Sequence, residues 1–410
     1  KTRILLLVSC PKIGGHFTPR LYDALQALLG QHCRWRDQRH LYPLVWMVVG
    51  LIASGQISLT AWSDYVQSRA VYAQSTQRRF SRWLLNPRVQ EQALYARLIR
   101  YALSVWQQER IVLALDTTML WNRYCVMRIV VVYRGRGIPV VWKVLEHASS
   151  TVAYSTYAPL LDAVVEVLPP ERQVLFLADR GFADVELFRH LHRLNWHYRI
   201  RVKSSFLVYR GKQGTPVGLY TLSTRHALFL HHVQITKARY GLVHLALAHH
   251  YPSREHWYVV SNQPTTTETF VEYGLRFDIE ENFLDDKSNG FQLESSQIRS
   301  APMLSRLCLV LAIATLYLTS TGTTVVEQGN RRQVDPHWFR GNRYFKIGWH
   351  WLRKALVQGW RLPTTLAFKS ALDPSPCISS KSQAAARKPL YFRCTTVDCA
   401  IPLEQTPSTA

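Results

Sequence analysis

The hydrophobic pattern of the chain changes its period near residue 109. Before this point, apolar residues recur at helical spacing, as in residues 21–29, or form an unbroken apolar segment that ends at glycine, as in residues 43–55. After it, short apolar runs over residues 111–116, 126–133 and 138–146 predict three strands joined by tight connections. The sequence therefore predicts a helical region that is followed by the start of a sheet.

The next part of the chain alternates between helix and strand patterns. Residues 155–170 have helical spacing and stop at a pair of prolines, and residues 174–179 form another apolar run. Residues 183–196 return to helical spacing, and residues 198–204 alternate polar and apolar side chains as a strand does. This alternation predicts an α/β fold with a mixed sheet flanked by helices.

A region with strand character interrupts the α/β pattern. Residues 205–262 contain several short apolar runs separated by turn residues, and they predict a β-rich insertion. The insertion is rich in histidine, but the spacings match no compact metal motif, so we expect solvated or core histidines. Further along, residues 307–318 are apolar but too few to cross a membrane comfortably, and they predict a buried helix.

One later stretch combines helical spacing with charge. Residues 271–291 predict a single helix that places Tyr273, Arg276, Glu280 and Lys287 within an arc of roughly 60°. Apolar residues lie on or near this face, so it should point partly inward. A carboxylate in such surroundings needs a positive partner, which Arg276, Lys287 or a metal ion could provide. The alternative is a solvated amphipathic helix with ordinary charge pairs.

Two of the predicted strands end in an aspartate, Asp116 and Asp179. Strand ends gather at one edge of an α/β sheet, and Glu280 would reach the same edge if its helix packed across it. Three converging carboxylates repel one another unless cations lie among them, and oxygen ligands favour Mg²⁺ or Mn²⁺. Two such ions about 4 Å apart would support phosphodiester chemistry. Four other acids compete for this role on composition alone: Glu146, Asp162, Asp184 and Glu281.

The charge of the chain indicates the kind of partner. Its 410 residues include 50 Lys and Arg but only 27 Asp and Glu, which gives a formal net charge of +23. Such an excess indicates a polyanionic partner, most often nucleic acid. The alternatives are a basic protein from a basic proteome and a protein that binds acidic membranes. Together with the candidate acids, the charge favours a nuclease or a DNA strand-transfer enzyme.

The cysteines and the N-terminal residues bear on the compartment. The seven cysteines are scattered and form no CxxC pair, which argues against a zinc ribbon and against a disulfide framework. The first residues contain only a short apolar run without a convincing secretory signal. We therefore expect a cytoplasmic protein that makes no membrane contact.

A basic and aromatic stretch lies in the N-terminal helical region. Residues 73–90 bring Arg78, Arg79 and Arg82 close to Phe80 and Trp83 along the sequence. Such a unit suits the recognition of a DNA end, because arginine binds phosphates and aromatic rings stack. The alternative is a helical packing domain with a charged face.

The motifs resemble a known family, the bacterial insertion-sequence transposases of the DDE type, and specifically the IS-four family that includes the Tn-five transposase. The family signature Y-(2)-R-(3)-E-(6)-K is matched without a gap by Tyr273, Arg276, Glu280 and Lys287. LALDTT and LADRGF resemble the segments that carry the two aspartates, and the β-rich insertion fills the expected slot. HWYVVSNQP resembles the tryptophan-bearing strand of the insertion, and RIRVKS resembles a basic strand facing DNA. The chain departs from the family pattern at Phe277, where tryptophan is common.

The resemblance implies an RNase H-like catalytic domain and cut-and-paste transposition with two Mg²⁺ ions, for which Mn²⁺ can substitute. It assigns the metals to Asp116, Asp179 and Glu280. It implies contacts with double-stranded DNA, both transposon ends and target, by a homodimer. The DNA-binding residues that follow from the basic stretch and from the resemblance are Tyr273, Arg276, Lys287, Trp257, Arg201, Lys203, Arg78, Arg79 and Arg82. Trp257 would hold a flipped base during hairpin formation, with a core tryptophan as the alternative.

These patterns divide the chain into six regions. In order, we expect a helical DNA-binding domain (1–108), the first part of the catalytic core (109–204), the β-rich insertion (205–262), the second part of the core (263–320), a basic aromatic region (321–372) and a mobile tail (373–410). Two other functions stay open: a transposase-derived DNA-binding protein without cutting activity, and a metal-dependent nuclease without strand transfer.

Overall fold

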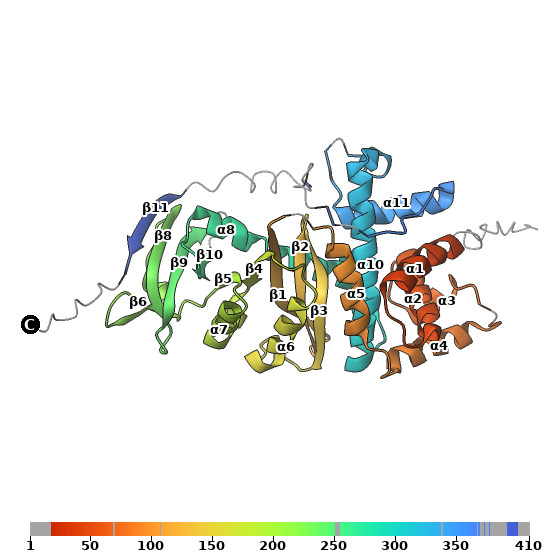
Figure 1. The fold of residues 1–410 in the computed structure, drawn as a ribbon, viewed down its shortest axis with the longest axis horizontal. Coiled ribbons are helices and arrows are strands. Elements are labelled where there is room, and N and C mark those ends of the chain that lie inside the picture. The colour runs from red at the N-terminus through yellow and green to blue at the C-terminus, as the bar shows by residue number, and fades with distance from the viewer. Residues whose placement is uncertain are drawn as a thin grey trace, which may run out of the picture. The chain divides into compact units, whose positions relative to one another are not determined.

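The chain forms two compact units, and each is assembled from separate segments. The helical unit comprises the described residues up to Ala102, Asp285–Pro336 and Tyr344–Phe368, and the sheet unit comprises the other described residues. Figure 1 shows the elements of both. The computed structural model describes residues 18–68, 70–106, 108–250, 255–337, 339–366, 368–369, 373, 377 and 392–400.

A mixed sheet forms the core of the sheet unit, and its first five strands have the order β3-β2-β1-β4-β5. These strands are β1 (Arg110–Leu120), β2 (Tyr124–Tyr133), β3 (Arg136–Glu146), β4 (Gln173–Ala178) and β5 (His197–Arg201). β1, β2 and β3 pair antiparallel, whereas β4 pairs parallel with both β1 and β5. This order and these directions are those of an RNase H-like fold, which confirms the predicted fold class.

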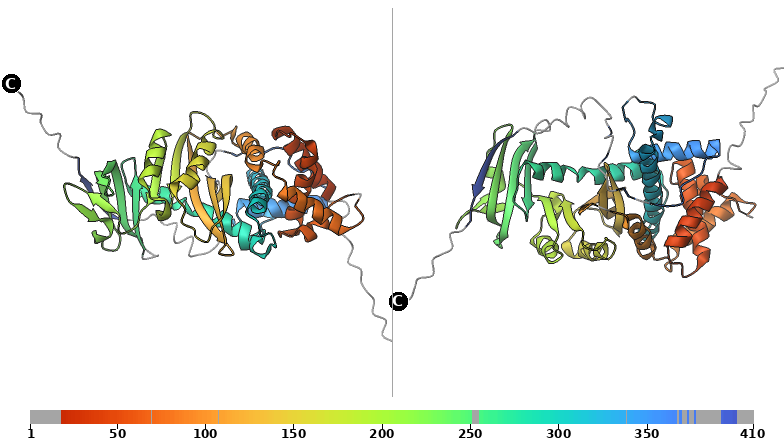
Figure 2. Two further views of the ribbon diagram at one scale, coloured as in Figure 1. Left: turned by 90° about the horizontal axis from the view of Figure 1, so that it is seen from below. Right: turned by 45° about the horizontal axis from the view of Figure 1, so that its top comes forward.

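Helices cover the core strands on both faces (Figure 2). On one face lie α6 (Tyr154–Val165) and α7 (Val185–Arg193), and on the other lie α8 (Thr267–Gly274) and α9 (Phe277–Leu284). Ile279 and Phe283 of α9 pack against Ala114, Val130 and Leu177 of three neighbouring strands. Burial on both faces explains why these strands are near-continuous apolar runs in the sequence.

The β-rich insertion extends this same sheet, because β10 pairs antiparallel with β5. Its strands are β6 (Leu207–Tyr209), β7 (Gly214–Pro216), β8 (His226–Ile235), β9 (Tyr240–His250) and β10 (Glu255–Ser261). The predicted strand character of residues 205–262 is confirmed. A further strand, β11 (Arg393–Asp398), pairs parallel with β8, so the expected mobile tail contains structure where Thr395, Thr396 and Val397 favour a strand. Most other residues of that tail, and residues 1–17, lie outside the described part of the chain.

A long apolar helix, α10, forms the centre of the helical unit. The helices of this unit are α1 (Thr18–His32), α2 (Leu41–Ser54), α3 (Leu59–Ser63), α4 (Ala73–Leu85), α5 (Glu91–Leu103), α10 (Ala301–Glu327) and α11 (Tyr344–Gln358). α10 packs against α2, α4 and α11, and residues 307–318 are buried within it, as predicted. By length and composition α10 is the one helix of the described chain that could span a membrane, but 78% of its most apolar window is buried inside the protein.

The backbones of α10 and α11 touch where a glycine of each helix meets the other. A Cβ on Gly322 would collide with the carbonyl of Tyr344, and one on Gly348 would collide with the carbonyl of Leu318. Residues 344–358 therefore pack on the core of the helical unit. The structure also divides the expected second part of the catalytic core, because the chain passes from the sheet unit to the helical unit at Asp285.

Candidate active site

The two predicted aspartates lie side by side where the parallel pairing of β1 with β4 ends; β1 itself continues to Leu120, whereas Asp179 directly follows β4. In the pairing of β1 with β4, Leu115 is opposite Ala178, and Asp116 and Asp179 are the next residues on each strand. Paired strands are about 4.8 Å apart, so the two carboxylates leave the sheet from neighbouring backbone positions. The two acids are therefore neighbours, as predicted, but only Asp179 lies at a strand end, because β1 continues through Asp116 and pairs with β2 as far as Leu120.

The single helix predicted for residues 271–291 is wrong. α8 ends at Gly274, α9 begins at Phe277, and a π-helical segment (Asp285–Asn289) follows. The junction between α8 and α9 is tightened by i→i−3 bonds, such as the one from the Arg276 amide to the Tyr273 carbonyl. Because such a junction and a π-helical segment both depart from 3.6 residues per turn, the calculated common face is lost. α8 itself begins before the predicted stretch, at Thr267, where the side chain of Thr266 caps it.

Arg276 joins two of the three acids. Its Nη1 donates to Asp116 Oδ2 at 2.9 Å and its Nη2 donates to Glu280 Oε1 at 2.5 Å. The Arg276 side chain is 5% exposed, whereas those of Asp116 and Glu280 are 18% and 48% exposed. A buried guanidinium that bridges two carboxylates needs both, because a buried charge left without a partner is strongly destabilising.

Tyr273 connects this bridge to the second aspartate. Its hydroxyl donates to Asp179 Oδ1 at 3.4 Å, and the Arg276 guanidinium lies 5.9 Å from the centre of its ring. Burial raises the pKa of Tyr273 to about 12, with Arg276 opposing and Asp179 supporting this shift, so the phenol stays protonated at neutral pH. A protonated hydroxyl can donate to Asp179, and the α8–α9 segment therefore reaches all three acids.

The charges around Asp116 act on one another. Burial raises the pKa of Asp116 to about 6. The Arg276 charge and the hydrogen bond from the Thr117 amide, 2.8 Å long, lower this pKa, whereas the negative charges of Glu280 and Asp179 raise it. For Arg276, burial opposes the charged form, but Tyr273, Asp116 and Glu280 raise its pKa above the usual value. The bridge is therefore charged at neutral pH.

A second buried arginine supports α9 from the sheet. Arg128 is opposite Asp116 in the pairing of β1 with β2 and is 1% exposed. Its Nη1 donates to Asn282 Oδ1 at 2.5 Å, and its guanidinium lies 5.1 Å from the ring centre of Phe283. Sequence reasoning did not single out Arg128, although a cation inside the apolar run VMRIVVVY was a usable signal.

A third arrangement, also missed, joins α8 to the sheet. Arg199 Nε donates to Glu272 Oε2 at 2.7 Å, and Arg110 pairs with the other oxygen of the same carboxylate. Arg199 also donates to Ser261 Oγ at 2.9 Å. Since Glu272 directly precedes Tyr273, these bonds fix the helix that places Tyr273 and Arg276.

The segment that carries this arrangement matches a known family. Residues 116–317 match the family model described as "Transposase DDE domain". The match begins at Asp116 and includes Asp179, Tyr273, Arg276 and Glu280. The matched segment is just under half of the chain, which is therefore similar to a DDE transposase over those residues.

Comparison with solved structures gives a weaker similarity. The chain is similar to "Cryo-EM structure of piggyBac transposase synaptic complex with hairpin DNA (SNHP)", with a TM-score of 0.42 and 9% sequence identity, over 85% of this chain and 80% of that chain. Similarity at this level carries no argument about the function of this chain. No curated protein matches the sequence.

The acids of the matched segment have the chemistry of a divalent metal site. Carboxylate oxygens are the ligands that Mg²⁺ and Mn²⁺ prefer, and Asp116 and Asp179 present them where β1 and β4 stop pairing. Among the described residues, however, no group of three His, Cys, Asp or Glu side chains is placed so that it could hold a metal ion. Arg276 provides the positive charge between Asp116 and Glu280 instead.

The four competing acids of the matched segment all have other structural roles. Glu146 forms an exposed pair with Arg123, and Glu281 accepts bonds from Arg136 and Arg343. The other two competing acids are also engaged. Asp162 is hydrogen-bonded to His190, and Asp184 caps α7. The geometry therefore favours Glu280 over Glu281 as the helix-borne acid.

The residues expected to bind DNA occupy different environments. Trp257 is 7% exposed and packs in an apolar cluster with Phe270 and Tyr273, which is the position of a core tryptophan. Arg201 is half-buried and donates to the His256 carbonyl at 3.1 Å. Lys203 is exposed, two residues beyond the end of β5.

The remaining expected DNA contacts lie in the helical unit. Lys287 belongs to its π-helical segment, where the ammonium lies 3.4 Å from Glu294. On α4, Arg78 and Arg82 are exposed, whereas Arg79 is half-buried, with its guanidinium 5.7 Å from the ring centre of Tyr42. The roles of all these residues in DNA binding stay predictions.

Proposed function

We propose that this protein is a DNA transposase that excises an insertion sequence by cutting its ends and joins those ends to target DNA. The observation that carries the proposal is the placement of Asp116 and Asp179 next to each other where β1 and β4 stop pairing, with Glu280 linked to Asp116 through Arg276. The transposase DDE domain match over the same residues supports it. The net charge of +23 agrees with a DNA substrate.

In this proposal Asp116, Asp179 and Glu280 would hold two Mg²⁺ ions, or Mn²⁺ in their place, once the three carboxylates draw closer together than they are in this structure. When bound, the ions activate the attacking oxygen and stabilise the leaving oxygen of a phosphodiester. The carboxylates must be ionised to act as ligands. Arg276 donates hydrogen bonds to the carboxylates of Asp116 and Glu280, and Tyr273 orients Asp179 through its hydroxyl.

The proposed reaction consists of successive substitutions at phosphorus. Water attacks a phosphodiester at the transposon end, and the bond to the 3′-oxygen breaks to leave a 3′-hydroxyl. That hydroxyl attacks a phosphodiester of the opposite strand, the 3′-oxygen of the flanking DNA leaves, and the hairpin that forms is reopened by a second water. The new 3′-hydroxyl then attacks target DNA, and a target 3′-oxygen leaves. Tyr273, Arg276 and Lys287 bind phosphates close to the cut, as the resemblance implies, with arginine as a fork and lysine as a point charge.

Both ends of a transposon have to be cut together, so the proposal includes a homodimer on double-stranded DNA. It also includes action at the nucleoid, inside the bacterial cytoplasm. These points follow from the IS-four-like signature and from the reaction, and they can be tested by measuring the mass of the complex with end-bearing DNA.

The decisive experiment compares the wild type with Asp116→Asn, Asp179→Asn and Glu280→Gln on DNA that carries the native ends of the element. With Mg²⁺ the wild type should nick, form hairpins and join ends to a supercoiled target, and each variant should bind DNA without cutting it. Wild-type cutting without joined products would identify a nuclease instead. Binding without any cutting would identify a DNA-binding derivative.

A further inference from the structure

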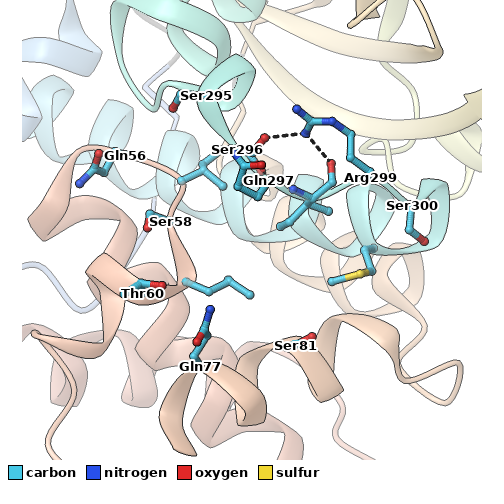
Figure 3. Close-up of a pocket in the computed structure, with 14 residues that line it drawn as sticks. Gln56, Ser58, Thr60, Gln77, Ser81, Ser295, Ser296, Gln297, Arg299 and Ser300 are labelled. Carbon is cyan, nitrogen blue, oxygen red and sulfur yellow. Dashed lines mark hydrogen bonds between the residues drawn. The ribbon is translucent and has the colours of Figure 1, made fainter. Parts of the chain in front are cut away.

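Two cavities of the helical unit differ in charge. The larger, about 590 Å³, is lined mainly by uncharged polar side chains, among them Gln77 and Ser81 of α4 (Figure 3). Its one arginine, Arg299, is turned back onto its own loop, where it donates to the carbonyls of Ser296 at 2.5 Å and Ile298 at 3.1 Å. This guanidinium is therefore hydrogen-bonded within the protein.

The smaller cavity, about 350 Å³, has the opposite character. We call it the arginine pocket, because four arginines from two separate segments line it: Arg34, Arg36, Arg88 and Arg97. All four residues are exposed. Within the described part of the chain, no hydrogen bond or ion pair engages any of the four guanidinium groups.

The one acid in the lining does not neutralise these arginines. Asp37 is paired with Arg39, which does not line the pocket, at an oxygen-to-nitrogen distance of 2.8 Å. Nε of Arg39 also lies 3.0 Å from each Asp37 oxygen. Four like charges around one cavity repel one another, so an anion that enters the pocket relieves that repulsion.

The walls of the pocket are fixed by bonds to the surrounding helices. Trp83 of α4 donates its indole N–H to the His40 carbonyl at 2.9 Å, and Trp35 donates to the Leu29 carbonyl at 3.0 Å. On the opposite wall, Arg306 of α10 donates to the Leu84 carbonyl at 2.9 Å and to the Val89 carbonyl at 3.3 Å. The backbone that carries the arginines is thus held in place before any ligand arrives.

We propose that the arginine pocket binds the phosphate backbone of duplex DNA. A guanidinium presents a planar fork that matches phosphate oxygens, and unpaired arginines are the form in which a protein offers that fork. Contacts with DNA phosphates do not distinguish one base sequence from another. They mainly set the affinity of the protein for DNA and its position on the duplex. The inference rests on the proposed function for the identity of the polyanion, but it concerns the helical unit and needs neither metal nor the three acids.

The test is the salt dependence of DNA binding in metal-free buffer, measured by fluorescence anisotropy with a duplex of random sequence. Each phosphate contact contributes about 0.9 to the slope of log affinity against log salt. Arg88→Ala/Arg97→Ala should lower the magnitude of that slope by roughly 2 and weaken binding about 10- to 100-fold near 0.1 M salt. The thermal midpoint should not change, because neither guanidinium has an ion-pair partner to lose.

The matched control removes the same charge elsewhere. Arg172→Ala/Arg361→Ala deletes two exposed arginines, one in each unit, that do not line the pocket. We expect this pair to keep the wild-type slope. Equal slopes for the pocket pair and the control pair would overturn the proposal.

Two further measurements distinguish a pocket for duplex DNA from a pocket for a small anion. The first measures the thermal shift of the wild type with inorganic phosphate and with a nucleoside triphosphate. If either ligand strongly stabilises the wild type, and Arg88→Ala/Arg97→Ala binds DNA as the wild type does, the pocket is assigned to a small anion. Asp116→Asn should bind DNA with the wild-type slope. If the wild type does not cleave DNA but the salt slope of Arg88→Ala/Arg97→Ala is reduced, the proposed function is refuted. The assignment of the arginine pocket to DNA binding then still holds.

Discussion

Arginine occupies opposite environments in the two units of this protein. In the sheet unit, Arg276 is buried and bridges Asp116 and Glu280. In the helical unit, the arginines of the arginine pocket are exposed and face no free carboxylate. A buried arginine has lost its hydration and needs internal hydrogen-bond acceptors, which for Arg276 are two acids, whereas an exposed one keeps its hydration and can exchange it for an external anion. The comparison teaches that the same residue type stabilises and orders one unit and gives the other its capacity to bind a polyanion.

The largest expected effect comes from removing an acid of the bridge. Asp116→Asn keeps the size of the side chain and removes the charge, so we expect metal-dependent cleavage to fall by more than about 100-fold, beyond the loss typical of residues that only support a metal ligand. DNA affinity should stay near that of the wild type. Arg88→Ala/Arg97→Ala is the complementary variant, and it should weaken binding while saturating DNA restores cleavage. If both variants lost cleavage and DNA affinity to the same extent, the two units would not have the separate roles described here.

The next effect is on stability. Arg276→Met leaves Asp116 buried without its partner, and breaking a buried pair destabilises a protein by about 3–5 kcal/mol. Arg97→Met removes an exposed side chain without an ion-pair partner, so the free energy of unfolding should change by less than about 0.5 kcal/mol. Urea unfolding measures the free energy of unfolding of both variants. A small decrease for Arg276→Met would show that the fold does not depend on the bridge from Arg276 to the two acids.

A smaller effect concerns pH. Burial raises the pKa of Asp116 to about 6, above its ordinary value of 3.8, so the folded state retains a proton that the unfolded state releases between these values. In metal-free buffer this group therefore lowers the free energy of unfolding as pH rises from about 4 to about 6, by roughly 2–3 kcal/mol. Asp116→Asn should remove this dependence. Because metal ligation needs the ionised carboxylate, wild-type cleavage should rise with pH through about 6.

The smallest expected effect tests whether an ion pair stabilises the protein when it is not buried. Arg123 and Glu146 form an ion pair 2.8 Å long, but their side chains are 59% and 56% exposed. Arg123→Ala should change the free energy of unfolding by less than about 1 kcal/mol, because solvent screens an exposed pair. A loss as large as that of Arg276→Met would show that burial does not govern the strength of the bridge.

Much of the sheet unit could be predicted from the pattern of apolar residues. Strands that are buried on both faces have short continuous apolar sequences, and this local signal located β1, β2, β3 and β4. Asp116 and Asp179 were found for the same reason, since each interrupts such a run at its end. The buried helix at residues 307–318 and the β-rich insertion also follow from local composition.

The helix that carries Glu280 could not be predicted in the same way. An ideal helical period places Lys287 on the face of Tyr273, but the tight junction after Gly274 and the π-helical segment at Asp285 change the rotation between them. Those departures depend on what the segment packs against: Arg276 bonds to Asp116, 160 residues away in the chain. Periodicity contains no information about such a partner.

The sequence by itself determined the order of strands and helices, the positive charge and the positions of the two aspartates, because each is a property of neighbouring residues. Only the tertiary structure decided that Arg276 neutralises Asp116 and Glu280 and that Arg34, Arg36, Arg88 and Arg97 share one cavity. The physical reason is that electrostatic pairing depends on distance through space and on burial. Both quantities exist only after segments far apart in the chain have packed together.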